Sequence, residues 1–489
     1  MTNKPLRLGD LDPQKWAPRT VRDELRENLR GKLEAGEPLF PGIVGYEETV
    51  VPQLVNAVMA RHDLILLGLR GQAKTRLCRQ LQELLDEETP IIPGCPLRSH
   101  PLAPLGRYAE ERVRDEGAAL ELEWLPRAAR YAEKLATPDV TMADLIGDID
   151  PLKAAHRKLD LSDEEVIHFG IIPRSNRGLF NINELPDLAP RIQVGLLNIL
   201  EEQDVQIRGF PVRFPLDVMM VFTANPEDYT NRGAIITPLK DRIASQILTH
   251  YPRSLDDARA ITGNEAWLDR AGSDVLVADF IVDIVEEIAF QGRDSEYVDQ
   301  TSGVSARLPI AARELLVSQI EARSLRQPGS SPVARVLDLA QVIPAITGKV
   351  ELVYEGEQEG PAKVARHLLG NACRVVFDRI FPDVMRDGGS EDAESSPSRY
   401  KPILDWFAAG KQLELTDALT DADFQTRLRA VSGLPELVAS CAPRDEASHP
   451  ALMELVLEGL HQHSMLAKED LATGTSYSDM LGIMLEGLQ

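Results

Sequence analysis

Cysteine is scarce in this sequence, which has only four among 489 residues. Cys78, Cys95, Cys373 and Cys441 include no pair at the spacing of metal ligands. Cys95 and His100 could contribute to a metal site, but two ligands without a second pair are more often structural, so we predict no zinc. Disulfide bonds are not expected either, because the sequence shows no signal peptide and a reducing compartment is expected.

Long hydrophobic runs, aromatic residues and basic residues are also in short supply. No apolar run reaches the roughly 18 residues of a membrane-spanning helix, so we expect no membrane insertion and a cytoplasmic location. Aromatic residues make up 5% of the chain against 43% for all hydrophobic residues, which favours helices and parallel strands. The 53 basic residues are outnumbered by 77 acidic ones, and the net charge of −24 disfavours nucleic acid as a partner.

One short stretch, residues 63–75, carries the strongest signal in the sequence. Its apolar run at residues 64–67 has the length of one buried parallel strand. Gly68, Gly71, Lys74 and Thr75 follow at the spacing of a Walker A phosphate loop, and a helix with leucines on one face comes next. The order of strand, loop and helix therefore predicts a nucleotide-binding loop rather than a chance glycine turn beside a lysine.

Elementary chemistry explains why a phosphate would bind to this loop. Glycines let the backbone turn so that several N–H groups point at one anion, and the helix N-terminus adds its dipole. Lys74 would reach the β- and γ-phosphates, and the hydroxyl of Thr75 would bind magnesium. Ala73 stands where the strict pattern has glycine. We expect it to be tolerated, because it adds one methyl group and can join the start of the helix.

Two further apolar runs end in polar residues and predict buried strands, at residues 178–185 and 217–226. Strands that alternate with helices predict a parallel α/β sheet whose site lies at the carboxyl edge. Residues 205–214 alternate in polarity around Gly209 and predict a β-hairpin. The residues between the phosphate loop and position 137 are expected to form a long irregular insertion that is helical around residues 108–116.

The chain is expected to comprise four parts. They are an N-terminal helical segment (1–39), an α/β nucleotide-binding domain (40–251), a helical lid (252–350) and a C-terminal helical extension (351–489). Amphipathic patterns at residues 275–290 and 306–323 predict helices of the lid. Residues 386–399 have the composition of a linker, and residues 400–489 are expected to form a last helical segment without a chemical motif.

The ends of the predicted strands supply candidate catalytic groups. Glu184 could polarise the water that attacks the γ-phosphate, while Asn183 stands where a magnesium-ordering aspartate is usual and keeps an oxygen without the charge. The neutral amide of Asn225 could hold water near the γ-phosphate, the guanidinium of Arg242 could stabilise phosphoryl oxygens, and Arg307 opens a predicted helix. Each residue also has a plainer alternative. Glu184 could be an exposed carboxylate at a strand end, and Asn225 a turn residue before proline. Arg242 could form a surface ion pair with the neighbouring aspartate, and Arg307 could be a solvated helix end.

Taken in this order, the motifs resemble those of the AAA+ ATPases over about residues 38–350, in particular the branch of MoxR proteins and magnesium-chelatase motor subunits. The resemblance rests on the Ile-Val-Gly sequence at residues 43–45, on Ala73, on residues 171–178 and on the hairpin before the strand that ends at Asn225. It implies an α/β fold with an AAA+ P-loop parallel-sheet domain, an all-α lid and a C-terminal helical region.

The same resemblance implies roles for individual residues. Val44 and Tyr46 would lie near adenine, Asn225 would act as sensor 1, Arg242 as an arginine finger on a neighbour's nucleotide, and Arg307 as sensor 2. The insertion at about residues 149–169 would face the pore of a ring. Magnesium would be held by Thr75 and, indirectly, by Asn183. ATP would be bound by Val44, Tyr46, Gly68, Gly71, Gln72, Ala73, Lys74, Thr75 and Arg76.

The function implied by the resemblance is that of a ring-forming ATPase, expected to be a hexamer, that remodels or activates a partner protein. That partner commonly carries a von Willebrand factor A domain and would here be a separate chain. Alternatives are the motor subunit of a magnesium chelatase in tetrapyrrole synthesis and a weakly hydrolysing nucleotide-binding scaffold, which only Asn183 favours. An enhancer-binding transcriptional activator ranks last, since the sequence lacks a Gly-Ala-Phe-Thr-Gly-Ala loop and a terminal basic helix-turn-helix.

Overall fold

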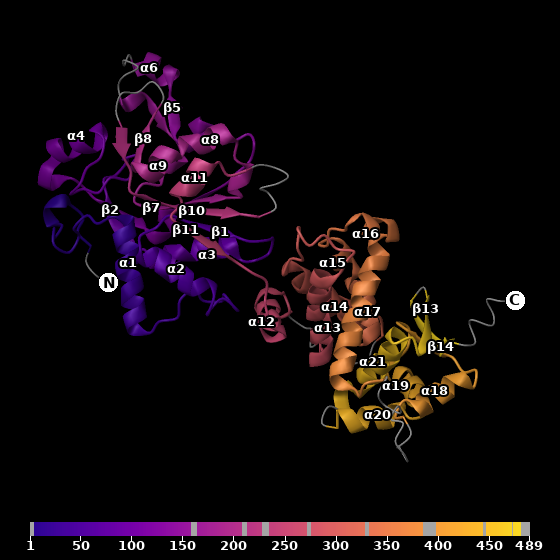
Figure 1. The fold of residues 1–489 in the computed structure, drawn as a ribbon. Helices are drawn as coiled ribbons and strands as arrows, with labels where there is room; N and C mark the ends of the chain where they lie inside the picture. Colours follow the sequence, from indigo (N-terminus) through magenta and orange to yellow (C-terminus); the bar gives the residue numbers. More distant parts are fainter. Residues whose placement is uncertain are drawn as a thin grey trace. The chain divides into compact units, whose positions relative to one another are not determined.

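The computed structural model describes residues 4–157, 164–207, 213–226, 234–270, 275–327, 332–384, 398–443, 446–471 and 473–480. The chain divides into two compact units, Met1–His250 and Tyr251–Gln489 (Figure 1). The first unit is a mixed α/β fold around a parallel sheet, and the second is mainly helical. The fold class predicted from the sequence is therefore confirmed.

The sheet of the first unit has five strands, β1 (Leu64–Leu67), β4 (Tyr131–Leu135), β7 (Gly178–Asn183), β10 (Val218–Ala224) and β11 (Ser245–Leu248). Their order across the sheet is β11-β1-β10-β7-β4, and every neighbouring pair is parallel. β1, β7 and β10 confirm the three buried strands that the apolar runs predict. β1 and β10 are buried along their whole length, as is typical of interior strands in a parallel sheet with helices on both faces.

Alternate residues of a strand face opposite sides of the sheet, so an interior strand such as β1 contributes to two hydrophobic cores. Leu64 and Leu66 share a core with α1, α2 and α3, whereas Ile65 and Leu67 share one with α8, α9 and α11. Figure 1 shows these helices along the two faces of the sheet. The helices of the unit are α1 (Val21–Ala35), α2 (Val50–Met59), α3 (Lys74–Gln80), α4 (Arg107–Glu116), α5 (Met142–Leu145), α6 (Pro151–Arg157), α7 (Ile171–Arg174), α8 (Pro190–Gly195), α9 (Leu197–Glu201) and α11 (Thr237–Arg242).

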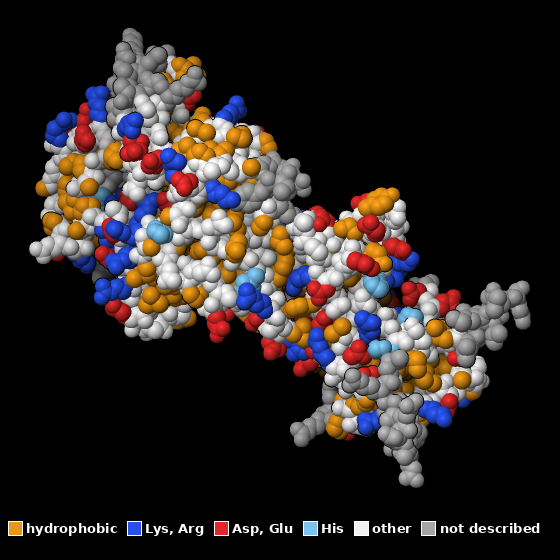
Figure 2. Space-filling model, in the orientation of Figure 1, with side chains coloured by type: hydrophobic (Ala, Val, Ile, Leu, Met, Phe, Trp, Pro, Cys, Tyr) orange, Lys and Arg blue, Asp and Glu red, His pale blue; other side chains and the backbone are white. Residues whose placement is uncertain are grey.

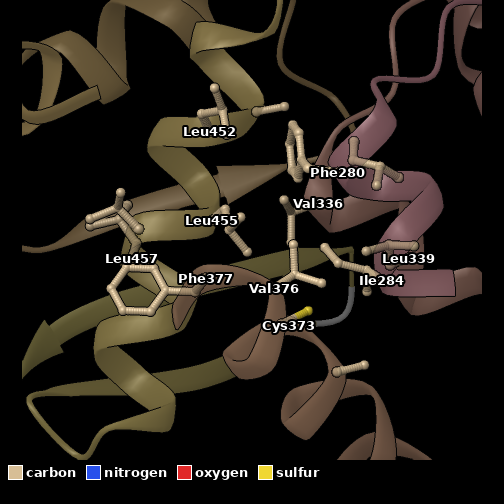
Figure 3. Packing of buried hydrophobic residues seen from close by; sticks show 14 of the residues in the cluster. Phe280, Ile284, Val336, Leu339, Cys373, Val376, Phe377, Leu452, Leu455 and Leu457 are labelled. Atoms are coloured by element: carbon tan, nitrogen blue, oxygen red, sulfur yellow. The ribbon is translucent and has the colours of Figure 1, made fainter. Parts of the chain in front are cut away.

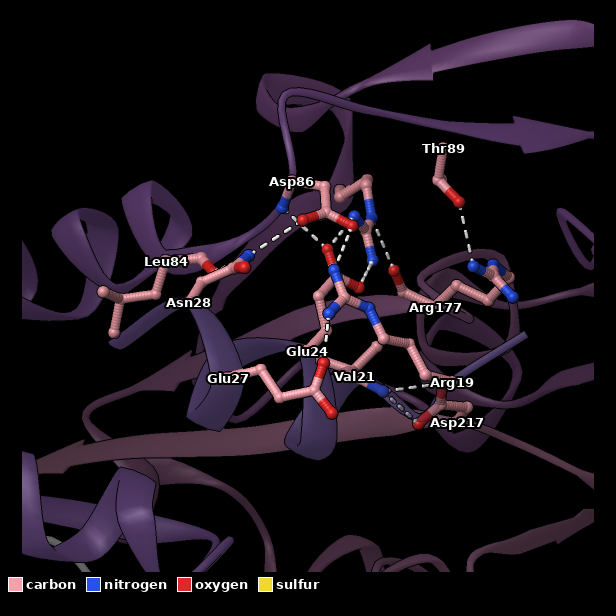
Figure 4. Close-up of polar contacts among 11 residues, drawn as sticks. Arg19, Val21, Glu24, Glu27, Asn28, Leu84, Asp86, Thr89, Arg177 and Asp217 are labelled. Atoms are coloured by element: carbon pink, nitrogen blue, oxygen red, sulfur yellow. Dashed lines mark hydrogen bonds and ion pairs between the residues drawn. The ribbon is translucent and has the colours of Figure 1, made fainter. Parts of the chain in front are cut away.

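Helix α1 is fixed to the sheet by buried polar contacts at its first turn (Figure 4). The backbone nitrogen of Val21 donates to both carboxylate oxygens of Asp217, at 3.0 and 2.9 Å. Glu24 accepts two hydrogen bonds of 2.6 Å from Arg130, and both side chains are almost fully buried. Removing one partner of such a buried pair typically costs about 3–5 kcal/mol, so these contacts hold α1 firmly against the sheet.

The stretch between the phosphate loop and position 137 is more regular than its sequence predicts. α4 confirms the helix expected around residues 108–116, but the expectation of an otherwise irregular insertion is wrong. The structure adds an antiparallel pair, β2 (Glu88–Ile91) with β3 (Glu123–Pro126), and the edge strand β4. Pro90 within β2 and the polar residues of β4 conceal these strands, because proline and charge are typical of sheet edges rather than interiors.

Two antiparallel strand pairs lie in the regions predicted as a hairpin and an insertion. β8 (Asp204–Gln206) pairs with β9 (Arg213–Pro215) and confirms the hairpin, whose residues 208–212 lie outside the described residues. β5 (Gly147–Ile149) pairs with β6 (Ile167–Phe169), and α6 lies between them in sequence. The rings of Phe169 and Phe214 meet edge to face with centroids 5.4 Å apart, so the two strand pairs pack together. Their position toward a ring pore stays a prediction.

The second unit is built around α21 (His449–Gln462), in which residues 451–460 are all buried. Figure 3 shows Leu452, Leu455 and Leu457 of this helix among side chains that include Phe377 and Val336. The helices predicted at residues 275–290 and 306–323 are confirmed as α13 and α14. Besides α21, the described helices of the unit are α12 (Leu255–Glu265), α13 (Asp279–Asp294), α14 (Arg307–Arg326), α15 (Ile343–Thr347), α16 (Tyr354–Glu359), α17 (Pro361–Ile380), α18 (Lys401–Ala408), α19 (Asp421–Arg429) and α20 (Leu434–Cys441).

The expectation of a purely helical segment over residues 400–489 is wrong in part. β12 (Leu413–Thr416), β14 (Gly474–Asp479) and β13 (Leu466–Leu471) form an antiparallel sheet in that order. Polar residues make up half of β13 and most of β14, and β12 is distant in sequence, so no local pattern predicts their pairing. Most of the expected linker at residues 386–399 lies outside the described residues. None of the described helices combines the length and apolar composition needed to cross a bilayer.

Glu286 of α13 is a buried acid in the core of the second unit. Its side chain lines a small cavity together with Thr262 and Arg293, and the residue is 1% exposed. Among the residues that the structure describes, no donor forms a well-aligned hydrogen bond with either carboxylate oxygen, although the Thr262 hydroxyl is close enough to affect the pKa of Glu286. Burial raises the pKa of Glu286 to about 7 from its usual 4.5, partly offset by the hydroxyl of Thr262 and the charge of Arg313.

We predict that Glu286 makes the second unit less stable as the pH rises from about 4.5 through about 7. The raised pKa means that the folded state binds this proton more tightly than the unfolded chain, so the stabilisation is complete at low pH and is then lost. A shift from 4.5 to about 7 corresponds to about 3 kcal/mol at most. Glu286→Gln should therefore raise the free energy of unfolding in urea at pH 8 by up to that amount.

The same variant should leave the free energy of unfolding nearly unchanged near pH 4, where Glu286 is neutral in both states. Glu296→Gln is a matched control. Glu296 is exposed, so its substitution should leave the free energy of unfolding unchanged at both pH values. An equal effect of Glu286→Gln at pH 4 and pH 8 would contradict the prediction. It would show that the packing of the side chain, not its ionisation, causes the difference in stability between glutamate and glutamine at this position.

Candidate functional site

The predicted phosphate loop lies between β1 and α3, and two of its residues have left-handed backbone conformations. Gly71 has a φ of +76° and Ala73 a φ of +54°. α3 begins at Lys74, so the expectation that Ala73 joins the start of the helix is wrong. A residue with a Cβ atom pays roughly 1–2 kcal/mol in this conformation, which explains physically why glycine is usual there.

Gly68 has no room for a side chain, because two residues anchor the loop beside it. A Cβ atom at Gly68 would lie 1.9 Å from the Thr249 hydroxyl and 2.1 Å from Oε1 of Gln72. Thr249 donates to that Oε1 atom at 2.7 Å, and the Tyr46 hydroxyl lies 3.0 Å from the carbonyl oxygen of Gln72 and 2.7 Å from that of His250. Tyr46 and Thr249 thus tie the loop to the segments before α2 and after β11.

The side chain of Lys74 is folded into the loop that it begins. It is 7% exposed, and its Nζ atom donates to the carbonyl oxygens of Gly68 and, at 3.0 Å, Leu69. A buried ammonium group needs acceptors, and these carbonyl groups provide them. The lysine is therefore already positioned on the loop, where anionic oxygens could replace the carbonyl groups.

Polar residues from the loop and from two strands meet at the carboxyl edge of the sheet. Oδ1 of Asn183 accepts a hydrogen bond from Thr223 at 3.2 Å and a longer one from the Thr75 hydroxyl at 3.5 Å. The backbone nitrogen of Glu184 donates to the Thr223 hydroxyl at 3.1 Å. Glu184 has a φ of +54°, a strained conformation for a residue with a side chain, and such strain is often found at functional sites.

Asn225 follows the last residue of β10 at the same edge. It is 5% exposed, and its Oδ1 atom is buried without a hydrogen-bond partner among the described residues. An unsatisfied buried acceptor costs about 1–3 kcal/mol, so its presence next to the loop strand β1 indicates a group that another molecule can satisfy.

The other predicted residues contact other parts of the first unit or belong to the second unit. Arg76, on α3, reaches toward the backbone of Gly42, ahead of the half-buried Val44. Arg242 ends α11 and forms an ion pair with Glu201 at 2.6 Å, not with the neighbouring aspartate. Arg307 is the exposed first residue of α14 in the second unit. The proposed contacts of these residues with a nucleotide stay predictions.

The oxygen atoms at the sheet edge fit a magnesium ion. Magnesium prefers oxygen ligands and keeps several water molecules when it binds to proteins. Thr75 and Asn183 place a hydroxyl and an amide oxygen 3.5 Å apart, and Glu184 adds a carboxylate next in sequence. Thr223 and Thr249 were missing from the sequence-based site, because a single threonine at a strand end carries no motif.

Comparisons with known proteins give distant matches. No protein-family model matches this sequence. The hydrogenase transcriptional regulatory protein HoxA of Cupriavidus necator is 26% identical over 233 residues, which are 44% of this chain and 48% of that protein. The chain thus spans about half the length of the curated relative that it matches.

Solved structures also resemble the chain, at low identity. A complex between subunits BchI and BchD of magnesium chelatase gives a TM-score of 0.35 and 19% identity, covering 66% of this chain and 99% of that one. NtrX from Brucella abortus in complex with ADP gives a TM-score of 0.37 and 13% identity, covering 74% and 68%. Because these scores and identities are low, a function for this chain has to be argued from its own residues.

Proposed function

We propose that this protein is an ATPase of the AAA+ type that assembles into a ring and uses ATP to remodel or activate a partner protein. The observation that carries the proposal is the meeting of Thr75, from the phosphate loop, with Asn183 at the end of β7, beside Glu184. A cradle for phosphate and an acid that can activate water then lie at one edge of the sheet. Transfer of a phosphoryl group to water requires both.

Each residue of the site has a part in the proposed reaction. Backbone N–H groups of the loop and the ammonium of Lys74 bind the phosphates, and Lys74 exchanges its contacts with loop carbonyl groups for phosphate oxygens. Magnesium, when bound, would neutralise phosphate charge; Thr75 would hold it directly and Asn183 through water. Glu184 accepts the proton of the attacking water, and Asn225 orients that water.

The placement of Arg242 supports a site that is shared between subunits. Its side chain is 31% exposed, and its ion pair with Glu201 lies at the surface of the same chain. Exposed ion pairs contribute at most about 1 kcal/mol, so Arg242 can leave Glu201 for the phosphate of a neighbouring subunit at little cost. We infer a ring, expected to be a hexamer, in which Arg242 completes the neighbour's site and Arg307 serves as sensor 2.

A protein is the proposed partner. Acidic residues exceed basic ones by 77 to 53, which disfavours a phosphate backbone. Figure 2 shows side chains of both charges interspersed over the visible face of each unit. The proposed partner is a separate chain with a von Willebrand factor A domain, and the proposed location is the cytoplasm. Asn183 favours one alternative, a nucleotide-binding scaffold that hydrolyses little.

A mixing experiment tests the shared site. Arg242→Ala subunits and Lys74→Ala subunits should each release no phosphate from ATP when they are assayed alone. In mixed rings, some sites combine an intact loop with an intact arginine from the neighbour, so phosphate release should reappear on mixing. No recovery in rings shown to contain both variants would refute the arrangement.

Glu201→Gln provides the matched control for Arg242→Ala. It removes the same ion pair but keeps the guanidinium group. Glu201→Gln should therefore retain the parent rate of phosphate release. If it loses activity as Arg242→Ala does, the ion pair serves the fold of the chain and not a neighbouring nucleotide.

A further inference from the structure

A chain of hydrogen bonds reaches Asn183 from the edge of the sheet. Asn181 lies two residues earlier on β7, so both side chains point to the same face of the strand. The Nδ2 atom of Asn181 donates to Oδ1 of Asn183 at 3.0 Å and to the Tyr131 hydroxyl on β4 at 3.1 Å. Asn181 is fully buried. Both of its N–H groups are therefore committed.

The donor and the acceptor in each of these hydrogen bonds follow from the number of protons that each group has. The Tyr131 hydroxyl donates its one proton to Glu133 at 3.0 Å, so its oxygen can only accept from Asn181. Glu133 is acceptor-only when ionised, and it also accepts from Nε of Arg79 at 3.0 Å. The amide of Asn181 cannot turn over without losing both of its donated bonds.

The same contacts connect the sheet to the helix that follows the phosphate loop. Thr75 and Arg79 are four residues apart on α3 and so lie on one face of that helix. Thr75 faces Asn183, and Arg79 binds Glu133. Oδ1 of Asn181 itself is buried without a partner among the described residues. Asn181 therefore leaves its oxygen without a hydrogen bond, while both N–H groups of its amide donate.

We propose that Asn181 is a positioning residue for the magnesium site, an inference that rests on the proposed function. An aspartate at position 183 would be symmetric and would present an oxygen in either orientation. An asparagine is not symmetric, and with its amide turned over it would direct N–H groups at the cation. The hydrogen bond from Asn181 holds Oδ1 of Asn183 toward Thr75, and Thr223 supports it at 3.2 Å.

Asn181→Leu keeps the branching of the side chain at Cγ, in a somewhat larger volume, and removes the donors. The test measures the affinity of the full chain for a fluorescent ATP analogue at increasing Mg²⁺ concentration, with EDTA as the metal-free reference. Changes to residues that orient metal ligands typically weaken metal binding by about 10–100-fold, and we expect the half-saturating Mg²⁺ concentration to rise by that factor. Binding of the analogue in EDTA should not change.

The decisive comparison repeats the substitution in the Asn183→Asp background. There the orientation of the side chain no longer matters, so Asn181→Leu should alter the half-saturating Mg²⁺ concentration by less than about threefold, within the error of such a comparison. An equal loss in both backgrounds would overturn the proposal, because Asn181 would then act only through the fold. Tyr131→Phe, which removes the acceptor for the other N–H group, should raise the half-saturating concentration by a smaller factor.

The outcomes separate the inference from the function on which it rests. A parent chain that binds no nucleotide contradicts the proposed function. A parent chain whose binding depends on Mg²⁺, together with an Asn181→Leu variant of unchanged Mg²⁺ dependence, contradicts the role of Asn181 alone.

Discussion

Lys74→Ala is expected to abolish the binding of ATP to the folded chain. The variant removes the buried ammonium group that donates to the loop and that would donate to the β- and γ-phosphates. Two charge-assisted hydrogen bonds at about 1.5–3 kcal/mol each correspond to a loss in affinity of about 10²–10⁴. Isothermal titration calorimetry with ATP and Mg²⁺ measures this loss directly.

Lys363→Ala is the matched control for this measurement. Lys363 lies on the exposed face of α17 in the second unit, 72% exposed at its side chain, and carries the same charge. Its substitution should leave the affinity for ATP unchanged. If Lys74→Ala folds like the parent chain, by circular dichroism, and binds ATP with parental affinity, the nucleotide site lies elsewhere.

Glu184→Gln is expected to bind ATP normally and to lose most of its turnover. Glutamine keeps the size of the side chain and accepts the same left-handed backbone, but it cannot take a proton from water. Removal of a positioned general base typically reduces the rate by about 10²–10⁴-fold. The rate of phosphate release at saturating ATP, measured beside the affinity for ATP, separates this effect from a loss of binding.

Asn183→Asp replaces an amide by a carboxylate at the position before Glu184. It restores a charge beside Thr75 and should leave ATP binding intact while it raises turnover. Hydrolysis by Glu184→Gln at the parental rate would show that another group activates the water. Failure of the parent chain itself to turn over bound ATP would favour the alternative of a nucleotide-binding scaffold.

The parts of the fold that the sequence predicts well are those that are coded locally. β1, β7 and β10 are apolar runs of strand length, because interior strands of a parallel sheet are buried on both faces. β4 and the antiparallel sheet of the second unit escaped prediction, because their residues are mixed in polarity and their partners are distant in sequence. Tertiary contacts, rather than local propensity, determine such strands.

The candidate site shows the same division between local and distant information. Thr75 and Asn183 stand in recognisable motifs, so their meeting at the sheet edge could be predicted from the topology. Asn181 and Tyr131 belong to strands that are far apart in sequence, and their role depends on the direction of single hydrogen bonds. A spacing pattern contains no information about such directions.

The rate of phosphate release per chain, measured on the unaltered protein over a range of chain concentrations, tests the proposed shared ATPase site most directly. We predict release that requires Mg²⁺, rises with chain concentration as rings assemble and then reaches a plateau. A constant rate per chain down to concentrations at which light scattering shows only monomers would contradict the shared site. No release at any concentration would contradict the ATPase itself.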